Sequence, residues 1–288
     1  MIRTIAGRHN PSLKLARRLQ SKKYRAKRGF FMAEGWDLLH AALTAGVWPA
    51  ELLVRDDIAE RLSEEVWSAA RTDRLDVAIC QAETLAGVSA LGGAADVVAV
   101  FPERRAGLSE WNLGTTVTLF LHEVGDPGNV GTLIRSASAF GAAGVACSPR
   151  TSDPFGVRAL RAGMGAHFLL PVATEVSPAD LMAHVRARAQ RGDAVPALVV
   201  ADPRGDVGSR DLAGELRRAR TVGRPDWAHG VVVALGSERG GLPDLADAPW
   251  AAQMRVAVPQ VRFDSLNVAM AGTIVLYELQ TIGQPEGR

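Results

Sequence analysis

The sequence of 288 residues contains no run of about 18 apolar residues, the length that an α-helix needs to cross a bilayer. Its opening stretch, MIRTIAGRHNPSLK, has no apolar core of the kind found in secretion signals, so we expect no export. Cysteine is scarce as well, since Cys80 and Cys147 are the whole complement. Two isolated cysteines in a chain without a signal indicate reduced thiols, and we expect a cytoplasmic protein.

Several catalytic motifs are missing too. HExxH and CxxC do not occur, so we expect no metal site. The stretch GDPGNVG (125–131) lacks the lysine of a phosphate loop, and its glycine spacing is not that of a dinucleotide-binding fingerprint. No Gly-x-Ser-x-Gly frame surrounds Ser237, which excludes the nucleophile elbow of an α/β hydrolase.

Acidic residues are absent from positions 1–28, which hold ten of the 33 Lys and Arg residues. The remaining chain has 23 basic and 31 acidic residues, a net charge of −8. Clustered cations without nearby acids repel one another, and such a cluster is the electrostatic footprint of a protein that binds a polyanion. The alternative interpretation is a helix face that is simply solvated.

The first third of the chain reads as a small α/β sandwich. Asn10 and Pro11 start a helix, because Asn caps helices and Pro suits the first helical position, and we expect it to run to Gly29. Strand and helix patterns then alternate from residue 30 to residue 101, with one helix predicted over 58–70. The polar segment 102–112 is expected to be a linker, so we predict two domains, residues 1–105 and 113–288.

A second α/β series begins with TTVTLFL (115–121), a continuous apolar run typical of a parallel strand that is covered on both faces. Further strands are predicted over 143–148, 196–202 and 230–236, and helices over 129–141 and 177–191. The last element, SLNVAMAGTIVLYELQTIG (265–283), is a long helix whose small residues permit close packing against the sheet or another subunit. The predicted fold class is α/β with a parallel sheet.

Polar residues follow the ends of three predicted strands, which is where open α/β sheets bind ligands. The first segment, HEVGDPGNVGTLIR (122–135), contains Asn129 and Arg135. Taken alone, its DPGN step is equally consistent with a turn that caps a helix.

The second segment, VVVALGSERGGLPD (231–244), places Glu238 in a glycine-rich loop, and glycines let a backbone approach a ligand closely. The third, VAVPQVRFDSLNVAMAG (256–272), contains Ser265 and Asn267 at the start of the last helix. Either residue could also serve only as a helix cap.

Together and in this order, the three segments resemble the signature of the SpoU-type (TrmH-like) RNA ribose 2′-O-methyltransferases of the SPOUT superfamily. The resemblance covers about residues 117–280 and includes SDPFGVRALRAGMGAHFLLPV (152–172). The stretch from NPSLK to WDLL (10–39) is similar to the RNA substrate-binding domain often attached in this family.

The resemblance implies a parallel sheet with a C-terminal deep trefoil knot, preceded by a small α/β/α sandwich domain. It implies S-adenosylmethionine as the cofactor, and a homodimer whose active site is completed across the interface. The implied reaction is methyl transfer to a ribose 2′-OH of structured RNA. We expect 23S ribosomal RNA as the substrate, for a housekeeping or an antibiotic-resistance modification, and transfer RNA is the alternative.

The motif positions also imply site residues. The expected catalytic residues are Asn129, Arg135, Glu238, Ser265 and Asn267. The expected cofactor-binding residues are Gly236, Ser237, Val258, Gln260 and Leu266. The residues expected to contact RNA are Arg8, Lys14, Arg17, Arg18, Lys22, Lys23, Arg25, Lys27 and Arg28.

Arg135 matches the family arginine that engages the phosphate and assists deprotonation of the hydroxyl. A guanidinium stays protonated at neutral pH and is a poor general base, so we expect Arg135 to lower the pKa of the ribose hydroxyl electrostatically. The third motif is one residue shorter than usual and has Gln260 where the family commonly has Met. The cofactor-binding assignments in this motif, that of Val258 above all, therefore allow a shift by one residue along the sequence.

Two other function classes stay open. A non-catalytic RNA-binding protein could keep this scaffold, but it would have no need of the polar residues in the three motifs and would not bind S-adenosylmethionine. A small-molecule nucleotide-binding enzyme would leave the ten cations in 28 residues unexplained, and it should show no steeply salt-dependent binding to RNA.

Overall fold

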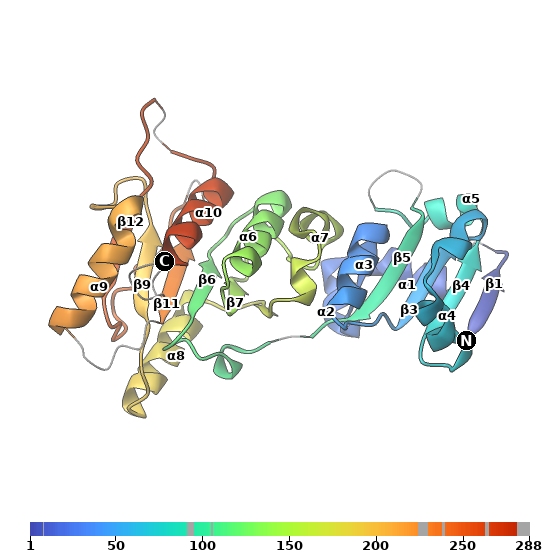
Figure 1. Ribbon diagram of the computed structural model, residues 1–288, viewed down its shortest axis with the longest axis horizontal. Coiled ribbons are helices and arrows are strands. Elements are labelled where there is room, and N and C mark those ends of the chain that lie inside the picture. The colour runs from blue at the N-terminus through green and yellow to red at the C-terminus, as the bar shows by residue number, and fades with distance from the viewer. Residues whose placement is uncertain are drawn as a thin grey trace. The chain divides into compact units, whose positions relative to one another are not determined.

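The computed structural model describes residues 1–7, 9–90, 95–104, 106–223, 230–237, 240–262 and 265–280 (Figure 1). The chain divides into two compact units, Met1–Arg104 with Phe155–Leu169 and Arg105–Pro154 with Leu170–Arg288. Among the described residues, no helix combines the length and the apolar character that crossing a membrane requires. The segment 155–169 groups with the first unit, so the second unit is discontinuous in sequence. The domain limits at 105 and 113 stay a prediction about which segments fold independently.

The first unit is built on a five-stranded mixed sheet. Its strands are β1 (Ile2–Ile5), β2 (Phe30–Glu34), β3 (Glu51–Arg55), β4 (Asp76–Cys80) and β5 (Val97–Pro102). Its helices are α1 (Pro11–Leu19), α2 (Lys22–Arg28), α3 (Trp36–Thr44), α4 (Glu64–Arg71), α5 (Ala82–Ala86) and α7 (Val157–Gly163), with 3-10 turns η1 (Asp56–Arg61) and η3 (Ala166–Phe168). The strand order is β1-β4-β3-β5-β2, with β5 antiparallel to both of its neighbours.

The prediction of one helix from Pro11 to Gly29 is wrong, because the chain forms two. Helix α1 ends at Leu19, and Ser21 is extended before α2. Helix α2 ends at Arg28 and is capped by Gly29 in the left-handed conformation (φ 68°). Arg25 is buried, and its guanidinium donates to the Leu19 carbonyl at the end of α1. Carbonyls at a helix end lack intrahelical partners, so this hydrogen bond stabilises the break.

The helix predicted over 58–70 also divides, into η1 and α4. Ser63 lies between the two and accepts a hydrogen bond from the Val66 amide, which makes it the N-cap of α4. A capping serine in the middle of an amphipathic pattern thus ended one element and started another.

Aromatic rings contribute to the core of the first unit. The Phe31 ring lies 5.1 Å from that of Phe155, and the Phe101 ring lies 4.8 Å from that of Phe168, measured between centroids. Phe31 is buried, whereas Phe30 is only partly buried against the core around α1. Of these two neighbouring phenylalanines of β2, Phe31 is therefore the one that packs fully in the core.

The second unit is a seven-stranded sheet in which all described strands run parallel, in the order β10-β12-β9-β11-β6-β7-β8. Its strands are β6 (Val117–Leu121), β7 (Gly144–Cys147), β8 (Val172–Ala173), β9 (Ala197–Ala201), β10 (Val207–Gly208), β11 (Val231–Leu235) and β12 (Gln253–Ala257). Its helices are α6 (Pro127–Ala139), α8 (Pro178–Gln190), α9 (Leu212–Gly223) and α10 (Val268–Leu279), with 3-10 turns η2 (Leu108–Glu110) and η4 (Ser209–Asp211). The α/β class with a parallel sheet is confirmed.

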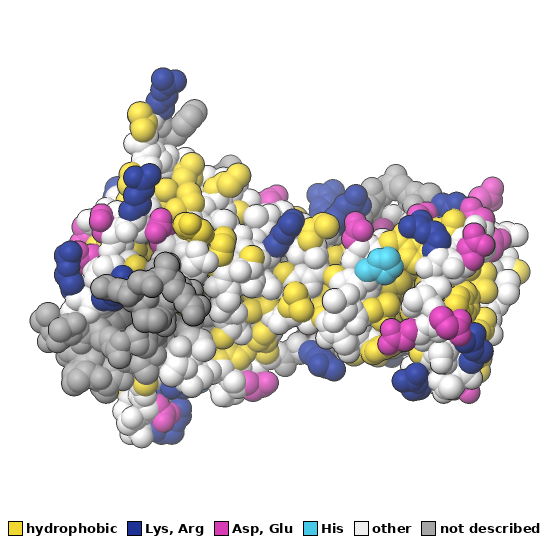
Figure 2. Space-filling model, in the orientation of Figure 1, with side chains coloured by type: hydrophobic (Ala, Val, Ile, Leu, Met, Phe, Trp, Pro, Cys, Tyr) yellow, Lys and Arg dark blue, Asp and Glu magenta, His cyan; other side chains and the backbone are white. Residues whose placement is uncertain are grey.

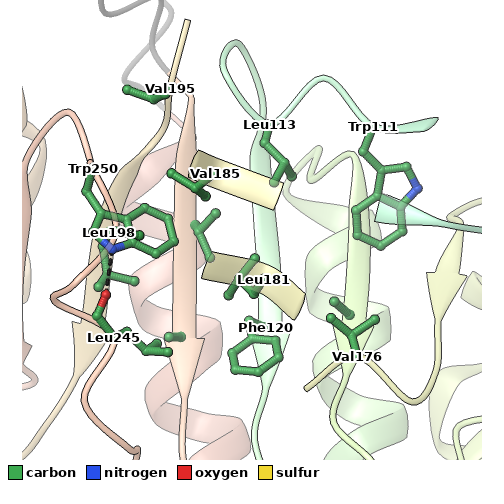
Figure 3. Close-up of a cluster of buried hydrophobic side chains, with 14 of the residues drawn as sticks. Trp111, Leu113, Phe120, Val176, Leu181, Val185, Val195, Leu198, Leu245 and Trp250 are labelled. Atoms are coloured by element: carbon green, nitrogen blue, oxygen red, sulfur yellow. Dashed lines mark hydrogen bonds between the residues drawn. The ribbon is translucent and has the colours of Figure 1, made fainter. Parts of the chain in front are cut away.

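Helix α8 covers one face of this sheet. Leu181 and Val185 of α8 are fully buried in a cluster with Phe120 of β6 and Leu198 of β9 (Figure 3). Trp250 belongs to the same cluster, and its indole Nε1 donates to the Leu245 carbonyl at 2.7 Å. This is the apolar face that the helical periodicity of residues 177–191 predicts.

Helices α6 and α10 lie together on the sheet, next to β6 and β11 (Figure 1). A Cβ on Gly272 of α10 would lie 2.5 Å from Leu133 Cδ2 of α6 and 2.6 Å from Leu235 Cδ1 of β11. The small residues of this helix permit close packing against either the sheet or another subunit. Gly272 packs closely against α6 and β11 of its own chain.

Candidate active site

A pocket of about 880 Å³ opens beyond the carboxyl ends of β9, β11 and β12. All five predicted cofactor-binding residues line it: Gly236, Ser237, Val258, Gln260 and Leu266. Ser265, predicted to be catalytic, lines the same wall. Parallel strands bring their carboxyl ends to one edge, which is why segments distant in sequence meet here. The volume is in the range of about 300–1,000 Å³ usual for small-molecule sites.

The loop after β11 folds back tightly on itself. The Gly241 amide donates to the Ser237 carbonyl and the Gly240 amide to Ser237 Oγ, both at 3.0 Å. A Cβ on Gly236 would lie 2.3 Å from the carbonyl carbon of Gly241, so only glycine fits there. The loop thus offers backbone groups to the pocket. Glu238, predicted to be catalytic, lies outside the described residues.

One wall of the pocket was not predicted. It comes from the loop after β9, where Asp202, Pro203, Arg204 and Asp206 line the cavity. Asp202 accepts from the Arg204 amide at 2.8 Å and pairs with the Arg255 guanidinium, and these contacts hold the pKa of its carboxyl below the usual value. The signal was available, because Asp-Pro-Arg-Gly follows a predicted parallel strand just as the 236–241 loop does.

Asn129 and Asn267, 138 positions apart, meet at the starts of α6 and α10. Asn267 Nδ2 donates to Asn129 Oδ1 at 3.0 Å. Asn267 is also the N-cap of α10 and accepts from the Ala269 amide at 2.8 Å. Asp126 caps α6 by accepting from the Asn129 amide at 2.8 Å. The capping interpretations of DPGN and Asn267 are therefore confirmed, and they coexist with a polar pair that could contact a ligand.

The loop that leads into α6 is held by the loop after β7. Glu123 has a left-handed backbone (φ 55°), its amide donates to Ser148 Oγ at 3.0 Å, and its carboxylate pairs with Arg150. His122 Nε2 lies 3.2 Å from Glu123 Oε1, and burial lowers the pKa of His122 despite this carboxylate. These contacts fix the approach of the chain to Asn129.

Arg135 lies on the exposed face of α6. Six positions on an α-helix place it about 9 Å along the axis and about 240° around it from Asn129. Arg135 is not among the described residues that line the pocket. Within one chain, the structure joins Asn129 to Asn267 and gathers the predicted cofactor-binding residues around one pocket, but Arg135 does not line that pocket.

The basic residues of the N-terminal segment lie mainly at the surface of α1 and α2. The exposed ones are Lys14, Arg18, Lys22, Lys23, Lys27 and Arg28. Arg17 is half-buried, and its Nε donates to the Gly87 carbonyl at 3.0 Å. Arg25 is buried against Leu19, so its guanidinium is not available at the surface. Arg8 lies outside the described residues.

Sequence comparison decides the family. The profile of the SpoU rRNA Methylase family matches residues 116–277. The chain belongs to this family. Residues 10–99 match the profile of the MRM3-like substrate binding domain, which covers most of the first unit.

Individual relatives agree with this assignment. The 23S rRNA (guanosine(2553)-2′-O)-methyltransferase RlmP of Bacillus subtilis is 29% identical over 179 residues, which are 62% of this chain and 67% of the relative. The AdoMet-bound rRNA methyltransferase from Sinorhizobium meliloti has a TM-score of 0.76 at 28% identity, over 99% of each chain. The AdoMet complex of the SpoU methyltransferase AviRb from Streptomyces viridochromogenes has a TM-score of 0.75 at 25% identity, over 94% of this chain and 97% of that one. The family resemblance of the three motifs is confirmed.

Proposed function

We propose that this SpoU family member transfers a methyl group from S-adenosylmethionine to a ribose 2′-OH of ribosomal RNA, with 23S rRNA as the substrate. The observation that carries the proposal is the pocket, where all five predicted cofactor residues meet at the carboxyl edge of the sheet. Further support comes from RlmP, which is named as a 23S rRNA methyltransferase, and from solved relatives of the same fold that hold AdoMet.

The residues of the pocket fit this cofactor. The backbone of Gly236 and the carbonyls of Gly240 and Gly241, whose amides already donate to Ser237, would pair with its polar edges. The side chains of Val258 and Leu266 would flank the adenine. S-adenosylmethionine supplies a methyl group on a positively charged sulfur. A Cβ at Gly236 would meet the backbone of Gly241, so glycine at this position lets the loop close on itself at the edge of the pocket.

The polar residues outside the pocket would handle the RNA. The linked amides of Asn129 and Asn267 would orient the target ribose by hydrogen bonds. Arg135 would hold the adjacent phosphate with its planar fork and lower the pKa of the 2′-OH, and a neighbouring group or water would take the proton. Ser265 would contact the substrate from the pocket wall, and Glu238 would orient Arg135 or a hydroxyl by a charge-assisted hydrogen bond.

A homodimer would complete this site. Arg135 lies on the solvent face of α6, and on the neighbouring helix α10 Met270 and Tyr277 are 62% and 55% exposed. Figure 2 shows hydrophobic side chains gathered over α10, and the Phe140 ring lies 5.7 Å from that of Tyr277. Exposed apolar surface on paired helices suits a second copy of the chain, which would bring Arg135 of one subunit to the pocket of the other.

Two further features complete the proposal. The C-terminal part of the chain would form the trefoil knot of the family, and the insertion of β11 between β6 and β9 is compatible with such threading. The reaction would take place in the cytoplasm, where ribosomal RNA is available.

Burial raises the pKa of the Cys80 thiol to about 11, as expected for an unreactive structural cysteine.

Methylation of total bacterial RNA with labelled S-adenosylmethionine, followed by mapping of 2′-O-methyl positions, tests the function. We expect one new position in 23S rRNA. Label in transfer RNA instead would favour the alternative substrate. Calorimetry that detects no binding at millimolar S-adenosylmethionine would overturn the enzyme proposal in favour of an RNA-binding scaffold.

A further inference from the structure

We propose that Tyr24 holds Arg18 and Arg28 together as a preformed pair of guanidinium groups that binds neighbouring phosphates of the RNA substrate. The inference rests on the proposed function, because it names the RNA contact of the first unit. It assigns Tyr24 a positioning role rather than a base-stacking one.

The three side chains form one cluster across two helices. The guanidinium carbons of Arg18 and Arg28 each lie 5.7 Å from the centroid of the Tyr24 ring. Arg28 Nε also donates to the Tyr24 hydroxyl at 3.2 Å. A cation near an aromatic face is attracted by the ring quadrupole, so the tyrosine restrains two long side chains at once.

The break between α1 and α2 creates this cluster. In one continuous helix, Arg18 and Tyr24 would be six positions apart, about 240° around the axis, and would not face each other. The chain instead turns at Gln20 and Ser21, and buried Arg25 fastens α2 to the last carbonyl of α1. Within α2, Tyr24 and Arg28 are neighbours at i and i+4.

The ring itself is held by the protein interior. Tyr24 packs against the core cluster that includes Leu13, Leu19 and Leu53, so its position is set by the fold. Both arginines lower the pKa of the Tyr24 hydroxyl, Arg28 more than Arg18, which agrees with their orientation around the phenol.

The charge of the cluster indicates a phosphate ligand. In the described part of the chain, neither guanidinium is paired with a carboxylate, and positions 1–28 contain no acid. Holding two cations near one ring costs Coulomb repulsion that a bound anion offsets. Arginine matches the oxygens of a phosphate with two parallel donors, and less conformational freedom is lost on binding when the fork is already ordered.

The test uses the full chain and in-vitro-transcribed, unmodified 23S rRNA in filter binding over a range of KCl concentrations. Arg18→Gln and Arg28→Gln should each weaken binding roughly threefold and reduce the slope of log K against log salt by about 0.7–0.9, the loss of one phosphate contact. Arg74→Gln is the matched control, since Arg74 is an exposed arginine of the same unit outside the basic segment. It should change neither quantity.

Tyr24→Leu and Tyr24→Phe separate positioning from direct contact. Both should weaken RNA binding with the salt slope unchanged, because the two positive charges remain and only the ordering of the two arginine side chains is lost. Tyr24→Phe keeps the ring against the core and should therefore lose less RNA affinity than Tyr24→Leu. In the background of Arg18→Gln with Arg28→Gln, Tyr24→Leu should have no further effect. An equal loss in that background would overturn the inference, because the ring would then contact RNA itself.

Two controls separate this inference from the proposed function. Calorimetry with S-adenosylmethionine and circular dichroism should be unchanged in every variant, which excludes unfolding. If the wild-type chain methylates 23S rRNA and substitutions at all three positions leave the affinity for RNA unchanged, only the inference about the arginine pair is refuted. If the wild-type chain neither binds nor methylates the RNA, the proposed function fails with it.

Discussion

The side chain of Asn267 accepts a hydrogen bond from the Ala269 amide with its oxygen and donates one to Asn129 with its nitrogen. The two tasks can be separated by substitution. Serine also caps helices but is too short to reach Asn129, whereas alanine can do neither.

We predict that Asn267→Ala lowers the free energy of unfolding by about 1 kcal/mol, and that Asn267→Ser changes it by less than about 0.5 kcal/mol. Both should reduce methyl transfer by about tenfold, the value of one well-placed hydrogen bond. Urea denaturation and single-turnover transfer measure the two effects. Asn129→Ala, which leaves the cap intact, is the control, and full activity of Asn267→Ser would contradict the role of the amide pair.

Arg135 is exposed in the single chain, so a change there should leave folding intact. We predict that Arg135→Ala lowers the rate of methyl transfer by about 10²–10³, as the loss of one preorganised charge does in other active sites. Arg135→Lys keeps the charge but not the planar fork and should lose at least about tenfold. Near-full turnover of the lysine variant would contradict a role for the fork. Calorimetry should show unchanged affinity for S-adenosylmethionine.

At the scale of elements, the contact of α10 with α6 and β11 depends on Gly272. We predict that Gly272→Ala destabilises the protein by about 1–3 kcal/mol, because the new methyl group displaces two buried leucines. Gly214→Ala in α9 is the matched control, since nothing lies within 4 Å of its Cβ position. It should stabilise by about 0.5–1 kcal/mol, the usual effect of replacing glycine in a helix. Thermal unfolding of the two variants should therefore shift in opposite directions.

Element types followed from local patterns, but several boundaries did not. Apolar runs identified β6 and β11, and the 3.6-residue periodicity identified α8 with its buried Leu181 and Val185. Strand β1 was missed because IRTI is short and half-exposed at the sheet edge. The division of α1 from α2 was missed because it depends on Arg25 reaching Leu19, a contact between helices that no local pattern contains.

At the scale of the whole molecule, the proposed dimer predicts that exposed residues of α10 control assembly. Met270→Glu and Tyr277→Glu should each convert the dimer to a monomer in analytical ultracentrifugation, because a charge would be buried in an apolar interface. Methyl transfer should fall with the loss of the dimer. Leu169→Glu, at a residue of the first unit that is 69% exposed, should change neither mass nor activity. A wild-type monomer that is fully active would refute the shared site.

The tertiary structure also decides how the basic segment can be tested. Removing residues 1–28 would delete edge strand β1 and the fully buried Leu13, Ala16 and Leu19, so the first unit would lose part of its core. A loss of RNA binding in such a truncation would report unfolding. Charge-neutralising substitutions on α1 and α2 keep the core and report the surface.

The sequence alone determined the α/β class, the family and the part of the pocket lining that comes from the second and third motifs, because motif order and apolar periodicity can be read directly from the chain. Only the tertiary structure decided which of these residues meet. Asn129 pairs with Asn267 and Arg18 with Arg28 through Tyr24 because helix ends and breaks bring them together, while Arg135 stays apart from the pocket of its own chain. The physical reason is that side-chain proximity depends on non-local packing, and residue spacing along the sequence does not encode it.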